Sequence, residues 1–227
     1  MTLEELGLVE EYSDVANLSQ DKWNKLVDHA AVQAELKDIN EGLSKSSKLA
    51  LYKDLVESPT LGFKCYLKGV MCSGKRLKFK LRSGTNALGA ELKRWSARDN
   101  DGACKCCTVG ALEDVKHFVV DCPKYAAVRK ELIGSLTKLF STGDAKGTEF
   151  LSVLQGKNKA NLLKLILAHE IDHSKVICKK FDKLVHCFLY EIYEIRNSFI
   201  FSSSKKFSPL NTCVKSGVND RKVSAKN

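Results

Sequence analysis

The sequence predicts a mainly α-helical fold that is interrupted by one short segment rich in cysteine and histidine. Apolar residues recur at spacings of three and four along most of the chain, and no alternating run of β-branched residues lasts beyond a few positions. The 227 residues are 44% hydrophobic, which is enough to bury a core. We divide the chain into an N-terminal helical segment (1–57), a basic segment leading into the cysteine-rich region (58–135), C-terminal helices (136–201) and a disordered tail (202–227).

Two helices are predicted in the N-terminal segment. Ser19 is a favourable N-cap residue, and the apolar pattern that follows it fades near Gly42. The apolar positions of this first helix are Trp23, Leu26, Val27, Ala30 and Ala34. A second helix is expected over about 46–57, because Pro59 prevents it from continuing.

The C-terminal part of the chain predicts four helices. One follows Pro123, a short one covers 150–155, and two longer ones cover about 158–173 and 175–201. The apolar residues of the last helix recur along one face and are Phe181, Leu184, Val185, Phe188, Leu189, Ile192 and Ile195. A helix with such a stripe is expected to pack on a core.

The net charge of +10 comes from an excess of basic residues that is regional. No acidic residue occurs over 58–90, and the cations of this stretch are Lys64, Lys68, Lys75, Arg76, Lys78, Lys80 and Arg82. The aromatic residues among them are Phe63, Tyr66 and Phe79. Such a stretch is typical of proteins that bind nucleic acid. The alternative is that the lysines form the solvated face of one or two short helices, interrupted at Gly69 and Gly74.

Four residues of metal-ligand type lie within nineteen positions. They form the pattern Cys104-x2-Cys107, nine residues, His117, four residues, Cys122. Three thiolates and one imidazole can complete a tetrahedron around Zn²⁺, so the spacing predicts a zinc site. A short helix is expected to open near Glu113 and to carry the last two ligands.

Two alternatives remain open for these residues. Cys106 competes for a ligand position, because the run from Cys104 to Cys107 offers three thiols where two are needed. The simpler interpretation is that the cysteines are buried apolar residues and that His117 is an ordinary surface residue.

A longer composite motif surrounds the metal ligands. It reads Leu-Arg-Ser-Gly-Thr-Asn-Ala-Leu over 81–88, Glu-Leu-Lys-Arg-Trp over 91–95, then the Cys-x2-Cys pair, Glu-Asp-x2-His-Phe from Glu113 and Cys-Pro-x-Tyr-x3-Arg from Cys122. This order resembles the zinc-binding region that follows the polymerase domain in open reading frames of non-LTR (LINE-like) retrotransposons. Two departures are Lys93, where a glycine is usual, and the additional Cys106.

The resemblance covers about 50 residues closely. It implies an intracellular zinc module, in the nucleus or cytoplasm, that assists nucleic-acid binding during target-primed reverse transcription. It places Cys104, Cys107, His117 and Cys122 at the ligand positions. Trp95 belongs to the motif. Like Phe63, Tyr66 and Phe79 it can stack on a base, but we expect it to be a core residue, because aromatic residues are more often buried.

One further pattern suggests an enzyme. His169-Glu170-x2-His173 matches the His-Glu-x2-His pattern of zinc proteases, in which two histidines share a helix face and the glutamate acts as a general base. The charged Asp172 between them and Lys175 after them depart from that pattern. We therefore favour the interpretation that both histidines lie on a solvated helix face.

These observations predict a non-enzymatic, zinc-dependent protein that binds RNA or DNA. The sequence has no aromatic-x-Asp-Asp polymerase signature and no Gly-x4-Gly-Lys-Ser/Thr phosphate loop. The first fifteen residues carry four glutamates and one aspartate, unlike a secretory signal, and no stretch is apolar enough to cross a membrane. The alternative function is a structural or protein-interaction module whose zinc only joins helices.

Overall fold

The prediction of a mainly helical fold is confirmed. The computed structural model describes residues 19–56, 67, 70–95, 101–141, 145–168, 171 and 173–201. Within these ranges the chain forms helices joined by short loops, and the extended backbone pairs only at an isolated antiparallel bridge between Ala103 and Leu112. The tail expected over 202–227 lies outside the described residues, as do Lys64 and Lys68.

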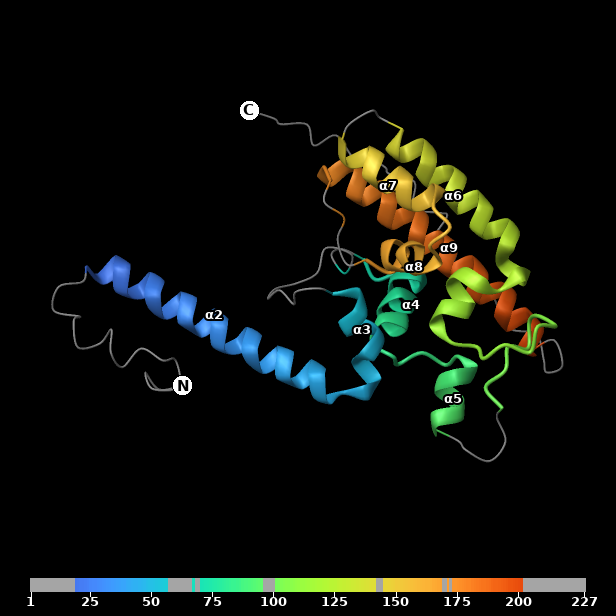
Figure 1. Ribbon diagram of the computed structural model, residues 1–227, viewed down its shortest axis with the longest axis horizontal. Coiled ribbons are helices and arrows are strands. Elements are labelled where there is room, and N and C mark those ends of the chain that lie inside the picture. The colour runs from blue at the N-terminus through green and yellow to red at the C-terminus, as the bar shows by residue number, and fades with distance from the viewer. Residues whose placement is uncertain are drawn as a thin grey trace, which may run out of the picture.

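The core is built around the long helix α9 (Lys175–Phe201), as its apolar stripe predicts. This helix packs against both α4 (Ser73–Arg82) and α6 (Ala126–Phe140), and Figure 1 shows α6 and α9 side by side. The residues that α9 buries are Phe181, Val185, Phe188, Leu189 and Ile192, together with the polar His186 and Arg196.

The contact between α4 and α9 depends on Gly74. We expected this glycine to interrupt a helix, but it lies in the first turn of α4. A Cβ atom at this position would lie 2.2 Å from the backbone oxygen of His186 on α9, which is far inside contact distance. Gly74 therefore allows the two helix backbones to approach closely.

The remaining helices close the core. Helix α7 (Ala145–Gln155) packs against α6 and begins before the predicted 150–155 segment. Helix α8 (Lys159–Leu167) is capped by the Asn158 side chain, which accepts hydrogen bonds from the backbone N–H groups of residues 160 and 161. The predicted extension of α8 to residue 173 is wrong. The buried guanidinium of Arg82 donates to the Leu167 carbonyl, so this oxygen is used at the point where a longer helix would bond to residue 171.

The N-terminal helix α2 (Gln20–Lys45) has a different environment. It extends away from the body in Figure 1, and none of its residues is buried. A 3-10 turn (Ser47–Leu49) and the short α3 (Ala50–Leu55) follow it, in place of the single helix predicted over 46–57. Helix α3 contacts both α2 and α4, and it thus links α2 to the body.

Candidate metal centre

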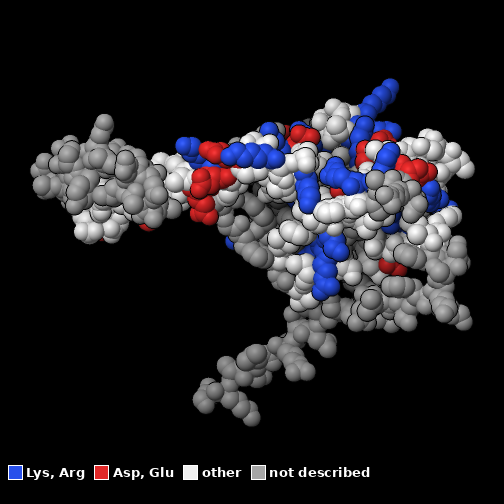
Figure 2. Space-filling model, turned by 90° about the horizontal axis from the view of Figure 1, so that it is seen from below, with Lys and Arg blue, Asp and Glu red and all other residues white. Residues whose placement is uncertain are grey.

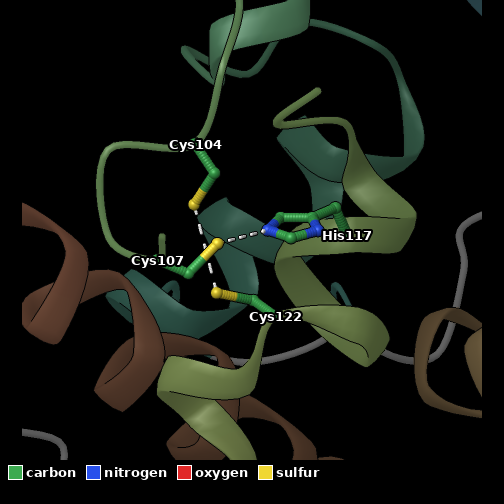
Figure 3. A group of neighbouring side chains, drawn as sticks. All are labelled: Cys104, Cys107, His117 and Cys122. Carbon is green, nitrogen blue, oxygen red and sulfur yellow. Dashed lines mark hydrogen bonds between the residues drawn. The ribbon is translucent and has the colours of Figure 1, made fainter. Parts of the chain in front are cut away.

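Four side chains converge at the junction of the loop 101–114 and the turn that follows it. They are the residues predicted as ligands, Cys104, Cys107, His117 and Cys122, and their donor atoms all lie within 4.8 Å of one another (Figure 3). The Sγ atoms of Cys104 and Cys122 are 4.0 Å apart, and Cys107 Sγ is 3.5 Å from His117 Nε2. This cluster could hold a metal ion.

These separations can be compared with a tetrahedral zinc site. Bond lengths of about 2.3 Å to sulfur and about 2.0 Å to nitrogen give edges of about 3.8 Å between two sulfurs and about 3.6 Å between sulfur and nitrogen. The separations of 4.0 Å and 3.5 Å are close to those edges. The donor atoms are thus arranged for coordination with little movement of the backbone.

The first pair of ligands lies on a tight loop. Gly102 and Gly110 both have positive φ, of 77° and 66°, which is a conformation that glycine adopts without strain. Backbone hydrogen bonds close the loop, from Cys104 N–H to the Ala111 oxygen at 2.8 Å and from Glu113 N–H to the Gly102 oxygen at 2.8 Å. Cys104 and Cys107 therefore lie on a loop that returns on itself.

The second pair lies on a helical turn that opens where the acidic residues predict it. The Asp114 carboxylate accepts a hydrogen bond from His117 N–H at 2.7 Å, as an N-cap residue does. The next turn is wide (His117–Asp121), and the Cys122 N–H bonds to the His117 oxygen five residues back at 2.7 Å. Because a wide turn holds more residues than an α-helical turn, His117 and Cys122 lie on the same side of it.

Arg129 holds this wide turn from behind. Its buried guanidinium donates to the Val119 oxygen at 3.1 Å and to the Cys122 oxygen at 2.9 Å. Val119 lies in the wide turn, and Cys122 follows it directly. Arg129 therefore fixes the backbone that carries the last ligand. The composite motif contains Arg129, but the sequence alone does not indicate this role.

A buried ion pair joins the loop 101–114, which we call the metal loop, to the core. Arg196 on α9 donates to both carboxylate oxygens of Glu113, at 2.7 Å and 2.8 Å, and to the Ala87 oxygen at 2.9 Å. Glu113 also accepts the Gly89 N–H at 2.7 Å, at the start of α5 (Gly89–Trp95). Sequence reasoning identified Glu113 only as a helix-opening acid and missed Arg196, which lies 83 residues further along the chain.

Cys106 lies outside the four-ligand cluster. Its thiol is buried and approaches Cys104 and Glu113, but both Glu113 oxygens are already bonded to Arg196 and Gly89. The Glu113 carboxylate is therefore already paired by hydrogen bonds within the protein. Of the three thiols that the sequence offers in the first half, Cys104 and Cys107 face His117 and Cys122.

Burial affects the cysteines in the cluster. It raises the pKa of Cys104 to about 12 and also raises the pKa of Cys122, and the nearby sulfur of Cys107 raises both further. Without a bound cation these thiols stay protonated at neutral pH. A metal ion would therefore displace protons when it binds.

The basic stretch is divided between surface and core. Arg76 and Lys80 are exposed on α4, whereas Lys78 and Arg82 are 0% and 1% exposed, so the prediction that these two residues bind nucleic acid is wrong. Lys78 Nζ lies 3.4 Å from Asp182 on α9, and burial lowers its pKa to about 8. Lys78 and Arg82 both lie on the face of α4 that packs on the core. They are four positions apart, and residues at that spacing share one face of a helix.

The two aromatic residues of this region that the structure describes are both exposed. Trp95 is 64% exposed, so the expectation that it belongs to the core is wrong. It is the last residue of α5, a helix that buries only Gly89. Phe79 on α4 is also exposed, while Phe63 and Tyr66 lie outside the described residues.

The two residues of the protease-like pattern that the structure describes, Ile171 and His173, are not helical. Helix α8 ends at Leu167, before the first histidine of the pattern, and α9 begins only at Lys175. His173 packs near the rings of Phe140 and Phe150, while His169 and Glu170 lie outside the described residues. Over the described residues, the single helix expected to carry both histidines is therefore not continuous.

Comparisons with known proteins add no relative. No family model matches the chain, and no curated protein and no solved structure is significantly similar to it. Among the helices that the structure describes, none combines the length and the apolar composition needed to span a membrane.

Proposed function

We propose that this chain is a non-enzymatic nucleic-acid-binding module whose fold depends on a structural Zn²⁺ ion. The observation that carries the proposal is the convergence of Cys104, Cys107, His117 and Cys122. Thiolate and imidazole donors favour Zn²⁺ among common cellular metals, and four protein ligands complete its tetrahedron. Such a closed site leaves no coordination position for a substrate, which supports a structural role and not a catalytic one.

The surface charge supports a polyanionic partner. The net charge is +10, and α4 still presents Arg76 and Lys80 after the buried cations are set aside. On the face that Figure 2 shows, basic side chains are spread over the body with acidic ones between them. We therefore expect a few phosphate contacts and not one continuous basic surface. The resemblance to the zinc-binding region of non-LTR retrotransposon proteins favours nucleic acid as the partner.

Salt dependence of binding tests this function. Each phosphate contact lowers the slope of log affinity against log salt by about 0.7 on a single strand, so three to five contacts give about −2 to −4. Replacing Arg76 and Lys80 with Gln should flatten that slope by about 1.4 and leave the zinc content unchanged. Replacing the exposed Lys138 and Lys164, on α6 and α8, removes the same charge and should flatten it less.

The result decides between two functions. A parent protein that binds neither RNA nor DNA at moderate salt contradicts the proposal. The zinc-joined protein-interaction module then takes its place. A parent that binds, with equal slopes for both pairs of substitutions, retains the function but removes α4 from the binding surface.

A further inference from the structure

Several exposed side chains lie near Trp95 at the end of α5. They are Leu92, Lys93 and Arg94 from the same helix, and Lys48 from the 3-10 turn before α3. We call these four residues and Trp95 the Trp95 patch. The patch lies beside the candidate metal centre, because the Lys93 side chain packs against Gly102 at the start of the metal loop.

The exposed ring of Trp95 contacts the ammonium group of Lys48. Lys48 Nζ lies 4.2 Å from the centre of the indole ring, which is the geometry of a cation–π contact. The position of Lys48 is itself constrained, because its backbone oxygen approaches Gly84 so closely that a Cβ atom there would lie 2.4 Å away. With 64% of Trp95 exposed, the ammonium covers one part of the ring system and a large part stays open to solvent.

The charge of the patch identifies the type of partner. Lys48, Lys93 and Arg94 are cations, and the acidic residue Glu91 is paired with Arg94 at 3.2 Å. An open indole face attracts flat π systems, and cations beside it attract phosphates. A single-stranded nucleic acid offers both groups together, with an unpaired base next to a phosphate. In a duplex the base faces are stacked on one another and cannot reach the ring.

We propose that the Trp95 patch binds single-stranded nucleic acid by stacking one base on Trp95, with Lys48 and the other cations of the patch contacting nearby phosphates. This inference rests on the proposed nucleic-acid-binding function and adds a selection for unpaired strands. An acidic peptide is the competing partner. It would use the same cations but would gain little from a flat aromatic ring.

Fluorescence anisotropy with labelled oligouridylate RNA, oligothymidylate DNA and a DNA duplex tests the proposal. Trp95→Ala should weaken single-strand binding about 5- to 100-fold, Trp95→Phe should retain part of the affinity, and duplex binding should change less than about two-fold. The salt slope should change little, because no cation is removed. The matched control is Phe199→Ala, since Phe199 on α9 is an exposed ring with Lys124 Nζ 4.1 Å from its centre, and it should leave binding unchanged.

A second measurement uses the indole itself. The chain has two tryptophans, so Trp23→Phe leaves Trp95 as the single reporter, and single-stranded oligonucleotide should quench its emission. Zinc content measured on every variant verifies that the metal loop is intact.

Several outcomes overturn the inference and separate it from the proposed function. A parent that binds no nucleic acid overturns both. If the parent binds but Trp95→Ala binds single strands as tightly as the parent, or loses single-strand and duplex affinity equally, only the stacking proposal fails. Equal losses in Trp95→Ala and Phe199→Ala also overturn it. Unchanged single-strand binding in Trp95→Ala, together with binding of an acidic peptide that Lys48→Gln weakens and Trp95→Ala does not, assigns the patch to a protein partner.

Discussion

The metal loop and helix α2 differ in how their sequence patterns relate to the burial of their residues. Helix α2 follows a regular helical period over its first half, yet none of its residues is buried. The metal loop has no helical period, yet it contains the buried Cys104, Cys106 and Glu113 and is bonded to α9 through Arg196. Periodicity therefore predicts where a helix forms, but the contribution of a segment to the core depends on the contacts it makes with distant parts of the chain.

The largest expected effect is the loss of metal. A structural Zn²⁺ site contributes on the order of 10 kcal/mol, which is comparable to the whole stability of a domain. Treatment with a chelator should therefore abolish the main transition in a thermal denaturation experiment, and His117→Ala and Cys122→Ala should behave alike. Cys106→Ala should retain zinc and cost only about 1 kcal/mol, because it removes one buried sulfur. An unchanged melting curve with no zinc released would contradict the structural role of the metal.

The next effect concerns the ion pair between the metal loop and α9. Glu113→Gln leaves the buried Arg196 without a charged partner, so it should lower the free energy of unfolding by about 3 to 5 kcal/mol. The matched control in the same loop is Lys105→Gln, since Lys105 pairs with Asp101 at 3.0 Å but both side chains are exposed. Denaturant unfolding should show almost no effect of this control. Equal effects of the two substitutions would show that burial does not distinguish the two pairs.

A smaller, pH-dependent effect on the free energy of unfolding is expected from the lowered pKa of Lys78. Burial lowers its pKa from 10.5 to about 8, so between these values the unfolded chain holds a proton that the folded chain has released. The free energy of unfolding should therefore rise with pH across this window. Relative to Lys78→Met, the parent should gain about 2 kcal/mol between pH 7 and pH 9.5, measured by urea denaturation. A constant difference across this range would contradict the lowered pKa.

The smallest effect is expected in α2. Ala34→Gly weakens the helix locally by about 1 kcal/mol, but it should leave the melting temperature unchanged because α2 contributes no buried residue. In contrast, Leu189→Ala on α9 removes a fully buried side chain and should cost about 2 to 5 kcal/mol. Hydrogen exchange should also be much faster in α2 than in the middle of α9. A loss of melting temperature in Ala34→Gly as large as in Leu189→Ala would show that α2 folds cooperatively with the body.

Sequence reasoning predicted those features that depend on local spacing. The apolar stripe of α9 and the ligand spacing of the metal loop both follow from the positions of residues along a short segment. It failed where a charge is matched by a distant residue. Lys78 is buried against Asp182, 104 residues away, and Arg82 is buried against the end of α8. The period of α4 places both cations on its buried face, but the sequence does not reveal their partners. Trp95 was misplaced for a related reason, because an aromatic residue in a motif does not reveal which surface covers it.

The separation of 83 residues between Glu113 and Arg196 has a consequence for synthesis of the chain. All four candidate ligands precede residue 123, so they leave the ribosome long before the end of α9 does. A cation can therefore be captured by a local loop while Glu113 still lacks its partner, and the loop can join the core only after Arg196 has emerged. Metal capture and docking would thus be separate steps in time, and a nascent chain that stops before residue 196 would retain the ligands without the anchor.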